Sequence, residues 1–235
     1  MSGSAPRDWD GIAEWWGSEV GDDPVYREDV APLLDRLTAG AAGPMLELGC
    51  GEGQWLRHLG PSDGVFGTDS SHRLLNDARK TAPVARGVLP DLGWLRDDSL
   101  GTAFSLFVLD LIEDHERFFV EAARVVCDGG ALVVIINHPA FTAPGSGPFM
   151  DEDMDVFWRW GTYLRRGESP VPAGDTMMTM YHRSTADLLT TAADSGWALE
   201  EMIEAPLGLA AIDREPSYIG QEGIPRFLGA RWRRG

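Results

Sequence analysis

A glycine-rich turn between a short strand and a helix constrains this chain more than any other feature. Residues 45–54 read MLELGCGEGQ, an apolar run followed by glycines at 49, 51 and 53. Glycine adopts positive φ without steric cost and leaves room for a ligand that lies on the turn. Open α/β sheets bind nucleotides in such crevices, at the carboxyl ends of their strands. The segment therefore predicts an α/β sheet with a nucleotide-like ligand at this turn.

The centre of the chain alternates short apolar runs with helical segments. This alternation is typical of a parallel sheet that is covered by helices on both faces. We predict strands over 44–48, 65–68, 84–86, 103–109, 131–137, 197–204 and 226–233, and helices over 53–59, 71–81, 114–127 and 184–195. The expected fold is α/β, a Rossmann-like doubly wound seven-stranded sheet with N-terminal helices and a lid insertion.

We expect one domain over residues 1–235, in four parts. Residues 1–42 form N-terminal cap helices, over 8–17 and 24–39, and Pro32 is expected to kink the second of them. The remaining parts are a cofactor-binding core over 43–137, a substrate lid insertion over 138–181 with a helix over 151–164, and a closing helix and strand pair over 182–235.

The charge balance excludes several classes of partner. The chain has 20 Lys and Arg against 37 Asp and Glu, a formal net charge of −17. Such a surface repels nucleic acids and anionic membranes, since phosphate binding depends on Lys and Arg. No apolar run reaches the roughly 20 residues of a membrane span, and Cys50 and Cys127 lie in no metal-ligand spacing. We expect a cytoplasmic protein with no metal, acting on a small molecule, as a monomer or a homodimer.

A carboxylate at the end of the second strand adds to the turn. Asp69 lies 20 residues after Gly49 and is placed to accept hydrogen bonds from both ribose hydroxyls. The acid disfavours a 2′-phosphate. The third glycine also comes one position too early for the dinucleotide pattern G-x-G-x-x-G.

At this point the sequence resembles the class I S-adenosylmethionine (SAM)-dependent methyltransferases. LELGCGEG at 46–53 is similar to their first motif, and GVFGTDSS at 64–71 is similar to their acidic ribose site. ARVVCDGGALVV at 123–134 is similar to the motif that leads into their fifth strand. The resemblance covers roughly residues 24–204 and implies SAM as the cofactor and S-adenosylhomocysteine as its product.

The resemblance also implies a role for particular residues. Val88 stands where the family often has an Asp that contacts adenine, and Ser105 stands where an Asp is usual, so a backbone group or Asp91 must serve the adenine amine. The implied contacts are Glu47 and the turn Gly49, Cys50, Gly51 and Gly53 with the methionine part, Asp69 and Ser70 with the ribose, Val88 and Leu89 with adenine, Leu109 and Asp110 near the sulfonium, and Tyr26 and Arg27 with the SAM carboxylate.

Three residues are candidates for catalysis. His138 follows the fifth predicted strand and is the first candidate for a general base; the alternative is a turn residue before Pro139. Asp110 lies near the expected sulfonium and is placed to orient an amine or a base. His115 begins a predicted helix, where the alternative is a solvent-facing position.

The insertion is rich in aromatic residues and Met, which suits a flat or hydrophobic ligand; the alternative is that they form the core of the lid. The sequence therefore predicts a methyltransferase that acts on O, N or C of a small, aromatic or hydrophobic metabolite. One alternative is a catalytically silent SAM-binding protein. Another is an NAD-dependent dehydrogenase or epimerase, which Lys80, the only lysine, does not favour because no Tyr precedes it at helical spacing. The acceptor and the need for a base stay open.

Overall fold

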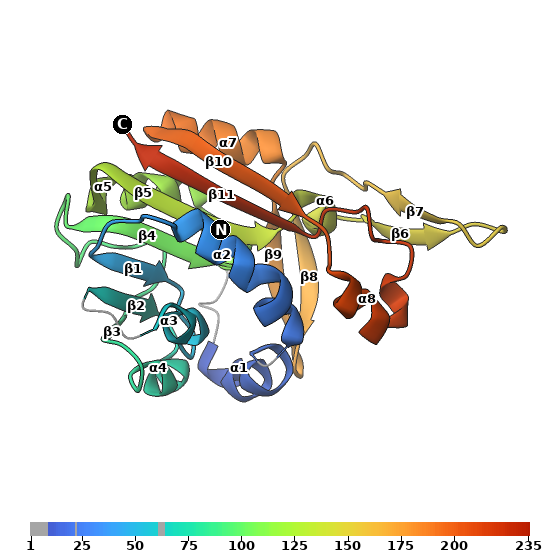
Figure 1. Ribbon diagram of the computed structural model, residues 1–235, viewed down its shortest axis with the longest axis horizontal. Coiled ribbons are helices and arrows are strands. Elements are labelled where there is room, and N and C mark those ends of the chain that lie inside the picture. The colour runs from blue at the N-terminus through green and yellow to red at the C-terminus, as the bar shows by residue number, and fades with distance from the viewer. Residues whose placement is uncertain (1–8, 22, 61–63) are drawn as a thin grey trace, which may run out of the picture.

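The centre of the molecule is a seven-stranded sheet with the order β10-β11-β5-β4-β1-β2-β3 (Figure 1). The computed structural model describes residues 9–21, 23–60 and 64–235. Strands β1 to β5 are parallel to one another. Strand β11 is antiparallel to both β5 and β10. The predicted Rossmann-like fold is confirmed. The strands are β1 (Met45–Leu48), β2 (Val65–Asp69), β3 (Val84–Arg86), β4 (Leu100–Leu106), β5 (Val126–Asn137), β10 (Trp197–Ala205) and β11 (Phe227–Arg234).

Strand β4 is placed three residues earlier than the sequence predicts. Phe107 has φ of 57°, a left-handed conformation that ends the strand. The following turn, η3 (Leu109–Leu111), therefore holds Leu109, which was expected to end the strand, and Asp110, which was expected just after it. All residues of β4 are buried, and its two polar side chains, Thr102 and Ser105, donate hydrogen bonds to the backbone carbonyls of Ala42 and Leu48.

Helices cover both faces of the sheet, and each face has its own hydrophobic core. Neighbouring residues of β4 point to opposite faces: Ala103 packs in the core below α5 and α7, and Phe104 in the core below α2, α3 and α4. The helices are α2 (Ala31–Thr38), α3 (Gln54–Leu59), α4 (His72–Ala78), α5 (His115–Val125) and α7 (Thr185–Asp194).

The N-terminal helices contain two π-helical turns. α1 (Trp9–Trp15) continues into η1 (Trp16–Val20), and η2 (Tyr26–Val30) leads into α2. Pro32 lies in the first turn of α2, where a backbone N–H would have no helical partner, so the N–H that proline lacks is not needed. The wide π-helical turn immediately before it accommodates its ring. The first residue of the predicted helix 8–17 lies outside the described residues.

The predicted helix over 151–164 is wrong. The segment instead forms a hairpin of β6 (Gly147–Met150) and β7 (Val156–Arg159). The Asp151 side chain accepts hydrogen bonds from the backbone N–H groups of Asp153 and Asp155, which favours a turn over a helix. Phe149 and Phe157 stack across the two strands with ring centroids 5.6 Å apart.

A second hairpin in the insertion was not predicted. Strands β8 (Gly167–Ala173) and β9 (Thr176–His182) are joined by a two-residue turn with Gly174 at φ of 60°. The sequence signal was the Gly-Asp pair at 174–175, which is typical of tight hairpin turns. A Cβ atom at Gly174 would lie 3.3 Å from Trp15, so this turn reaches the N-terminal helix.

The insertion is divided between these two hairpins (Figure 1). The β6–β7 hairpin extends away from the sheet, while β8 and β9 run toward α1. Aromatic residues of the first hairpin, such as Phe149 and Trp160, are about half exposed. The short helices α6 (Pro139–Thr142), α8 (Leu209–Arg214) and η4 (Pro216–Tyr218) complete the described structure. No helix in its described parts is long and apolar enough to cross a membrane.

Strand β4 begins very close to the loop before β1. A Cβ atom at Gly101 would lie 2.5 Å from the carbonyl oxygen of Ala42 and 2.7 Å from that of Gly43. Both contacts are with backbone atoms, which cannot rotate away. The β4–β5 register also shifts between Leu100 and Thr102, so the sheet depends on glycine at this point.

We expect Gly101→Ala to lower the free energy of unfolding by about 1–3 kcal/mol, the usual cost of overpacking. Gly223→Ala is the matched control, because no heavy atom lies within 4 Å of its added Cβ and its φ is not left-handed. Its effect should stay within about 0.5 kcal/mol. Urea denaturation of both variants measures the difference, and equal effects would contradict the steric argument.

Candidate active site

The glycine-rich turn after β1 adopts left-handed backbone conformations throughout. Gly49, Gly51 and Gly53 have φ of 82°, 52° and 84°. A Cβ atom at Gly49 would overlap the side chain of Val108, so the turn and the end of β4 approach closely only because this residue is glycine. A Cβ atom added at Gly51 would have its nearest neighbour, the Trp16 side chain, 3.9 Å away, which leaves open space above the turn.

Asp69, at the end of β2, is hydrogen-bonded to this turn. Its Oδ2 accepts the backbone N–H of Gly51 at 2.9 Å, and its Oδ1 accepts that of Ser71 at 2.8 Å. Burial raises the pKa of Asp69, while the backbone N–H groups act in the opposite direction. A carboxylate offers about four acceptor positions, so Asp69 keeps capacity for a ligand's hydroxyl groups.

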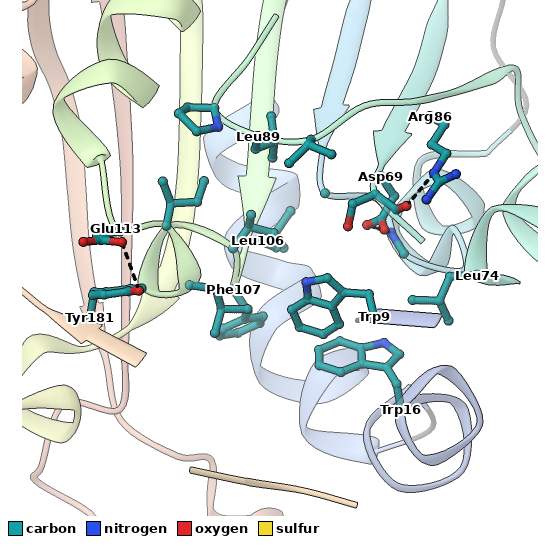
Figure 2. Close-up of a pocket in the computed structure, with 18 of the residues that line it drawn as sticks. Trp9, Trp16, Asp69, Leu74, Arg86, Leu89, Leu106, Phe107, Glu113 and Tyr181 are labelled. Atoms are coloured by element: carbon teal, nitrogen blue, oxygen red, sulfur yellow. Dashed lines mark hydrogen bonds between the residues drawn. The ribbon is translucent and has the colours of Figure 1, made fainter. Parts of the chain in front are cut away.

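Asp69 and the turn open into a cavity of about 440 Å³. Figure 2 shows Asp69 and Arg86 at one end, Glu113 and Tyr181 at the other, and Phe107 between them. The cavity therefore extends from β2 across β1 and β4 to β9. Of the predicted cofactor-binding residues, those that line it are Gly49, Gly51, Asp69, Ser70, Val88 and Leu89.

The other predicted cofactor residues lie outside the cavity lining. Gly53 packs against Ala78, Cys50 is buried in the core, and Leu109 is buried in the opposite core. Tyr26 packs edge-on against Trp55 and Phe107, and burial raises the pKa of its hydroxyl to about 12. The Arg27 side chain is 79% exposed, with Glu28 as its ion-pair partner at 3.9 Å.

Glu47 is buried directly before the glycine turn. Neither of its carboxylate oxygens has a hydrogen-bond partner among the described residues. Burial and the nearby carboxylates of Glu52 and Asp69 raise the pKa of Glu47 well above its ordinary value. A buried carboxylate without a partner is costly, and the raised pKa means that Glu47 takes up a proton more readily than an exposed acid does.

His138, the first candidate base, is held by the fold. Its Nδ1 accepts the backbone N–H of Ala140, and its Nε2 lies 2.8 Å from Glu204. Because Nδ1 accepts a hydrogen bond, the neutral ring carries its proton on Nε2 and donates it to Glu204. His138 caps α6 and does not line the cavity, so the alternative of a turn residue describes its position.

Asp110 and His115 are also outside the cavity lining. Burial raises the pKa of Asp110 to about 7, and its Oδ2 accepts hydrogen bonds from the backbone and side chain of Asn137. His115 is buried between α5 and α7, with Nε2 3.3 Å from the Thr191 hydroxyl and 3.7 Å from Asp187. His115 is therefore also not at the solvent-facing position that was given as the alternative to catalysis.

Several residues that line the cavity were missed by the site prediction. Asp10 holds α1 over the cavity: its Oδ1 accepts the Ser71 hydroxyl at 2.6 Å and the Arg73 N–H at 2.9 Å. Trp9 and Trp16 lie seven positions apart, a helical spacing that gives the signal for a shared face. Among the missed lining residues are Trp9, Asp10, Arg86, Phe107, Glu113 and Tyr181.

Comparisons with known proteins agree with this geometry. The family model described as a methyltransferase domain matches residues 46–134. An uncharacterized protein of Mycobacterium tuberculosis is 29% identical over 230 residues, which span 97% of this chain and 72% of that protein. A trans-aconitate 2-methyltransferase of Variovorax paradoxus is 31% identical over 107 residues, 43% of this chain and 41% of that enzyme.

Among solved structures, an S-adenosylmethionine-dependent methyltransferase from Mesorhizobium loti is similar over 91% of this chain and 100% of its own. The TM-score is 0.76 and the sequence identity is 27%. The described sheet and turn are thus shared with an enzyme of that class.

The burial of His115 predicts a loss of stability in acid. Burial, followed by the charges of Arg183 and Arg166, lowers the pKa of His115 to about 4, whereas an unfolded His titrates near 6.5. Between these values only the unfolded chain binds the proton. Stability should therefore fall as the pH drops from about 6.5 to about 4, by at most about 3 kcal/mol from this residue.

Urea denaturation across that pH range tests this assignment. His115→Asn should weaken the pH dependence, whereas His72→Asn, at an exposed position, should leave it unchanged. An unchanged pH dependence in His115→Asn would show that another group is responsible.

Proposed function

We propose, from the premise that this chain is a class I S-adenosylmethionine-dependent methyltransferase, that it methylates O, N or C of a small, aromatic or hydrophobic metabolite. The observation that carries the proposal is the cavity that continues from Asp69 and the glycine turn past Phe107 to Tyr181. Beyond the turn its walls include the apolar side chains of Leu111 and Ile112.

The residues present fit the cofactor. Asp69 would accept hydrogen bonds from the ribose hydroxyls, and the open space above Gly51 would admit the methionine part. Val88 and Leu89 would border adenine with apolar side chains. Glu47 is buried and lies outside the cavity lining, so it is not among the residues proposed to contact the ligand. When bound, SAM supplies a methyl group on a positively charged sulfur. A nucleophile would attack the methyl carbon in line with the S–C bond, and the sulfur would leave.

The contribution of the protein to such a reaction is positioning and the exclusion of water. Trp9 and Trp16 cover the cavity from the N-terminal helices, and Asp10 fixes them to Ser71 (Figure 2). His138 and His115 are held by partners in the fold, so neither is proposed as a base. The ionisable groups near the acceptor end are Glu113, Asp114 and Tyr181.

Asp69→Ala should weaken binding of S-adenosylhomocysteine about 10- to 100-fold, the usual loss when hydrogen bonds to a charged group are removed. Isothermal titration calorimetry measures the change. Asp69→Asn is the second variant: its single amide oxygen can accept only one of the N–H groups of Gly51 and Ser71, so urea denaturation of both variants is needed to separate ligand binding from folding. Asp77→Ala, an exposed carboxylate on α4 that pairs with Lys80, is the control and should bind as the wild type does.

Two results would overturn this function. One is wild-type protein that does not bind S-adenosylhomocysteine and instead binds NAD, which would return the glycine turn to the dinucleotide interpretation. The other is unchanged affinity in both Asp69 variants, which would place the ligand elsewhere.

A further inference from the structure

Among the described residues that line the far end of the cavity there are carboxylates and aromatic rings but no Lys or Arg. Glu113 lies at its mouth, and the Tyr181 hydroxyl is 3.5 Å from the Glu113 Oε2. Asp114 is adjacent, where its Oδ1 caps α5 by accepting the N–H of Arg117. The wall is completed by Phe107, Leu111 and Ile112.

The basic residues near this end are committed to other partners. Arg86 is the one Lys or Arg among the described residues that line the cavity, and it lies at the adenine end with Nε bound to the Ser70 carbonyl at 2.9 Å. Arg183 is buried behind the loop and donates to the carbonyls of Leu109, Ile112, Glu113 and Tyr181. The Arg183 guanidinium also lies over the Tyr181 ring, 5.6 Å from its centroid, but its N–H groups are taken up by these carbonyls. A carboxylate or phosphate acceptor would therefore meet Glu113 without a Lys or Arg in the described lining to bind it.

Aromatic side chains on both sides of the cavity add a second, independent preference for a cation. Trp9 and Trp16 face the cavity from the N-terminal helices, and Phe107 lines it from the sheet side (Figure 2). Tyr181 also lines it, but the Arg183 guanidinium already lies 5.6 Å from the centroid of its ring. The faces of such rings attract positive charge within about 6 Å of their centroids. Rings and a carboxylate around one space form a site for an apolar amine.

We infer that the acceptor is a hydrophobic amine, methylated on nitrogen, and that Glu113 is a specificity-determining residue that holds its positive charge. This inference rests on the proposed methyl transfer and narrows it to one class of acceptor. In the reaction the bound ammonium first loses a proton to solvent, and the free amine then attacks the methyl carbon. The N–C bond forms as the S–C bond breaks, and the electron pair of the S–C bond stays on sulfur. The positive charge moves to nitrogen, and one proton then leaves the ammonium for solvent.

The carboxylate of Glu113 favours this reaction over methylation of an acid or an alcohol. In amine methylation the nitrogen becomes positive in the transition state, and a nearby carboxylate stabilises charge that develops there. An oxygen nucleophile is neutral or negative at the same point, so the same carboxylate would give no stabilisation or would repel it.

The first experiment compares matched acceptors that differ in charge. Protein saturated with S-adenosylhomocysteine is titrated with arylalkyl amines, alcohols and carboxylates, beginning with 2-phenylethylamine, 2-phenylethanol and 3-phenylpropanoate. Methyl transfer from SAM to each set is followed by mass spectrometry. We expect binding and methylation among the amines. Hits confined to acids or alcohols, or no amine among the hits, would overturn the inference, while binding of S-adenosylhomocysteine would still support the proposed function.

The second experiment tests Glu113 with the best amine. Glu113→Gln should raise KM by up to about fivefold, the upper end of the range for a partly solvated ion pair. It should also weaken the rise of KM with salt that is expected of the wild type. Glu116→Gln is the matched control: it removes the same charge three residues later, from a side chain that pairs with Arg166 outside the cavity.

The competing explanation is that Glu113 faces the positive sulfur of the donor. Affinities for SAM, which is a sulfonium, and for S-adenosylhomocysteine, which is a neutral thioether, distinguish the two. Their ratio should be the same in Glu113→Gln and in the wild type. A selective loss of SAM affinity, or an unchanged KM for the amine, would contradict the assignment to the acceptor.

Discussion

The floor and the cover of the cavity are joined by one short chain of hydrogen bonds through Asp69. Its two carboxylate oxygens accept the N–H groups of Gly51 and Ser71, and the Ser71 hydroxyl donates to Asp10 on the N-terminal helix. The β1 turn, the end of β2, the start of α4 and α1 thus share one carboxylate. Since charge-assisted hydrogen bonds are stronger than neutral ones, the geometry of the site depends on this residue.

Arg183 has the corresponding role at the opposite end. Its guanidinium donates to carbonyls of the loop after β4 and of β9, among them Leu109 and Ile112. Burial lowers the pKa of Arg183 to about 10, so it remains charged at neutral pH. The loop leaves β4 through the left-handed Phe107, and a buried cation that satisfies its carbonyls holds that conformation in place. The acceptor end is therefore built on a rigid support, although it consists of loop residues.

The sequence predicted those parts of the molecule that local rules determine. The parallel strands of the core, the glycine turn and Asp69 follow from periodicity and spacing, because a buried parallel strand and a left-handed turn each leave a residue signature. The hairpin over 147–159 escaped because its spacing of aromatic residues also fits a helix, and only the side-chain hydrogen bonds of Asp151 decide between the two. His138 and His115 were misplaced for a different reason: their partners, Glu204 and Thr191, lie far away in sequence.

The location of the cover also bears on how ligands reach the site. The predicted lid contributes Tyr181 to the described lining, whereas the N-terminal helix contributes Trp9, Asp10 and Trp16. The net charge of −17 gives the surface a negative potential that attracts cations toward the cavity. SAM carries a sulfonium and the inferred acceptor an ammonium, so one field favours both substrates. The neutral thioether product is attracted less, and the same charge distribution that gathers the substrates therefore favours its release.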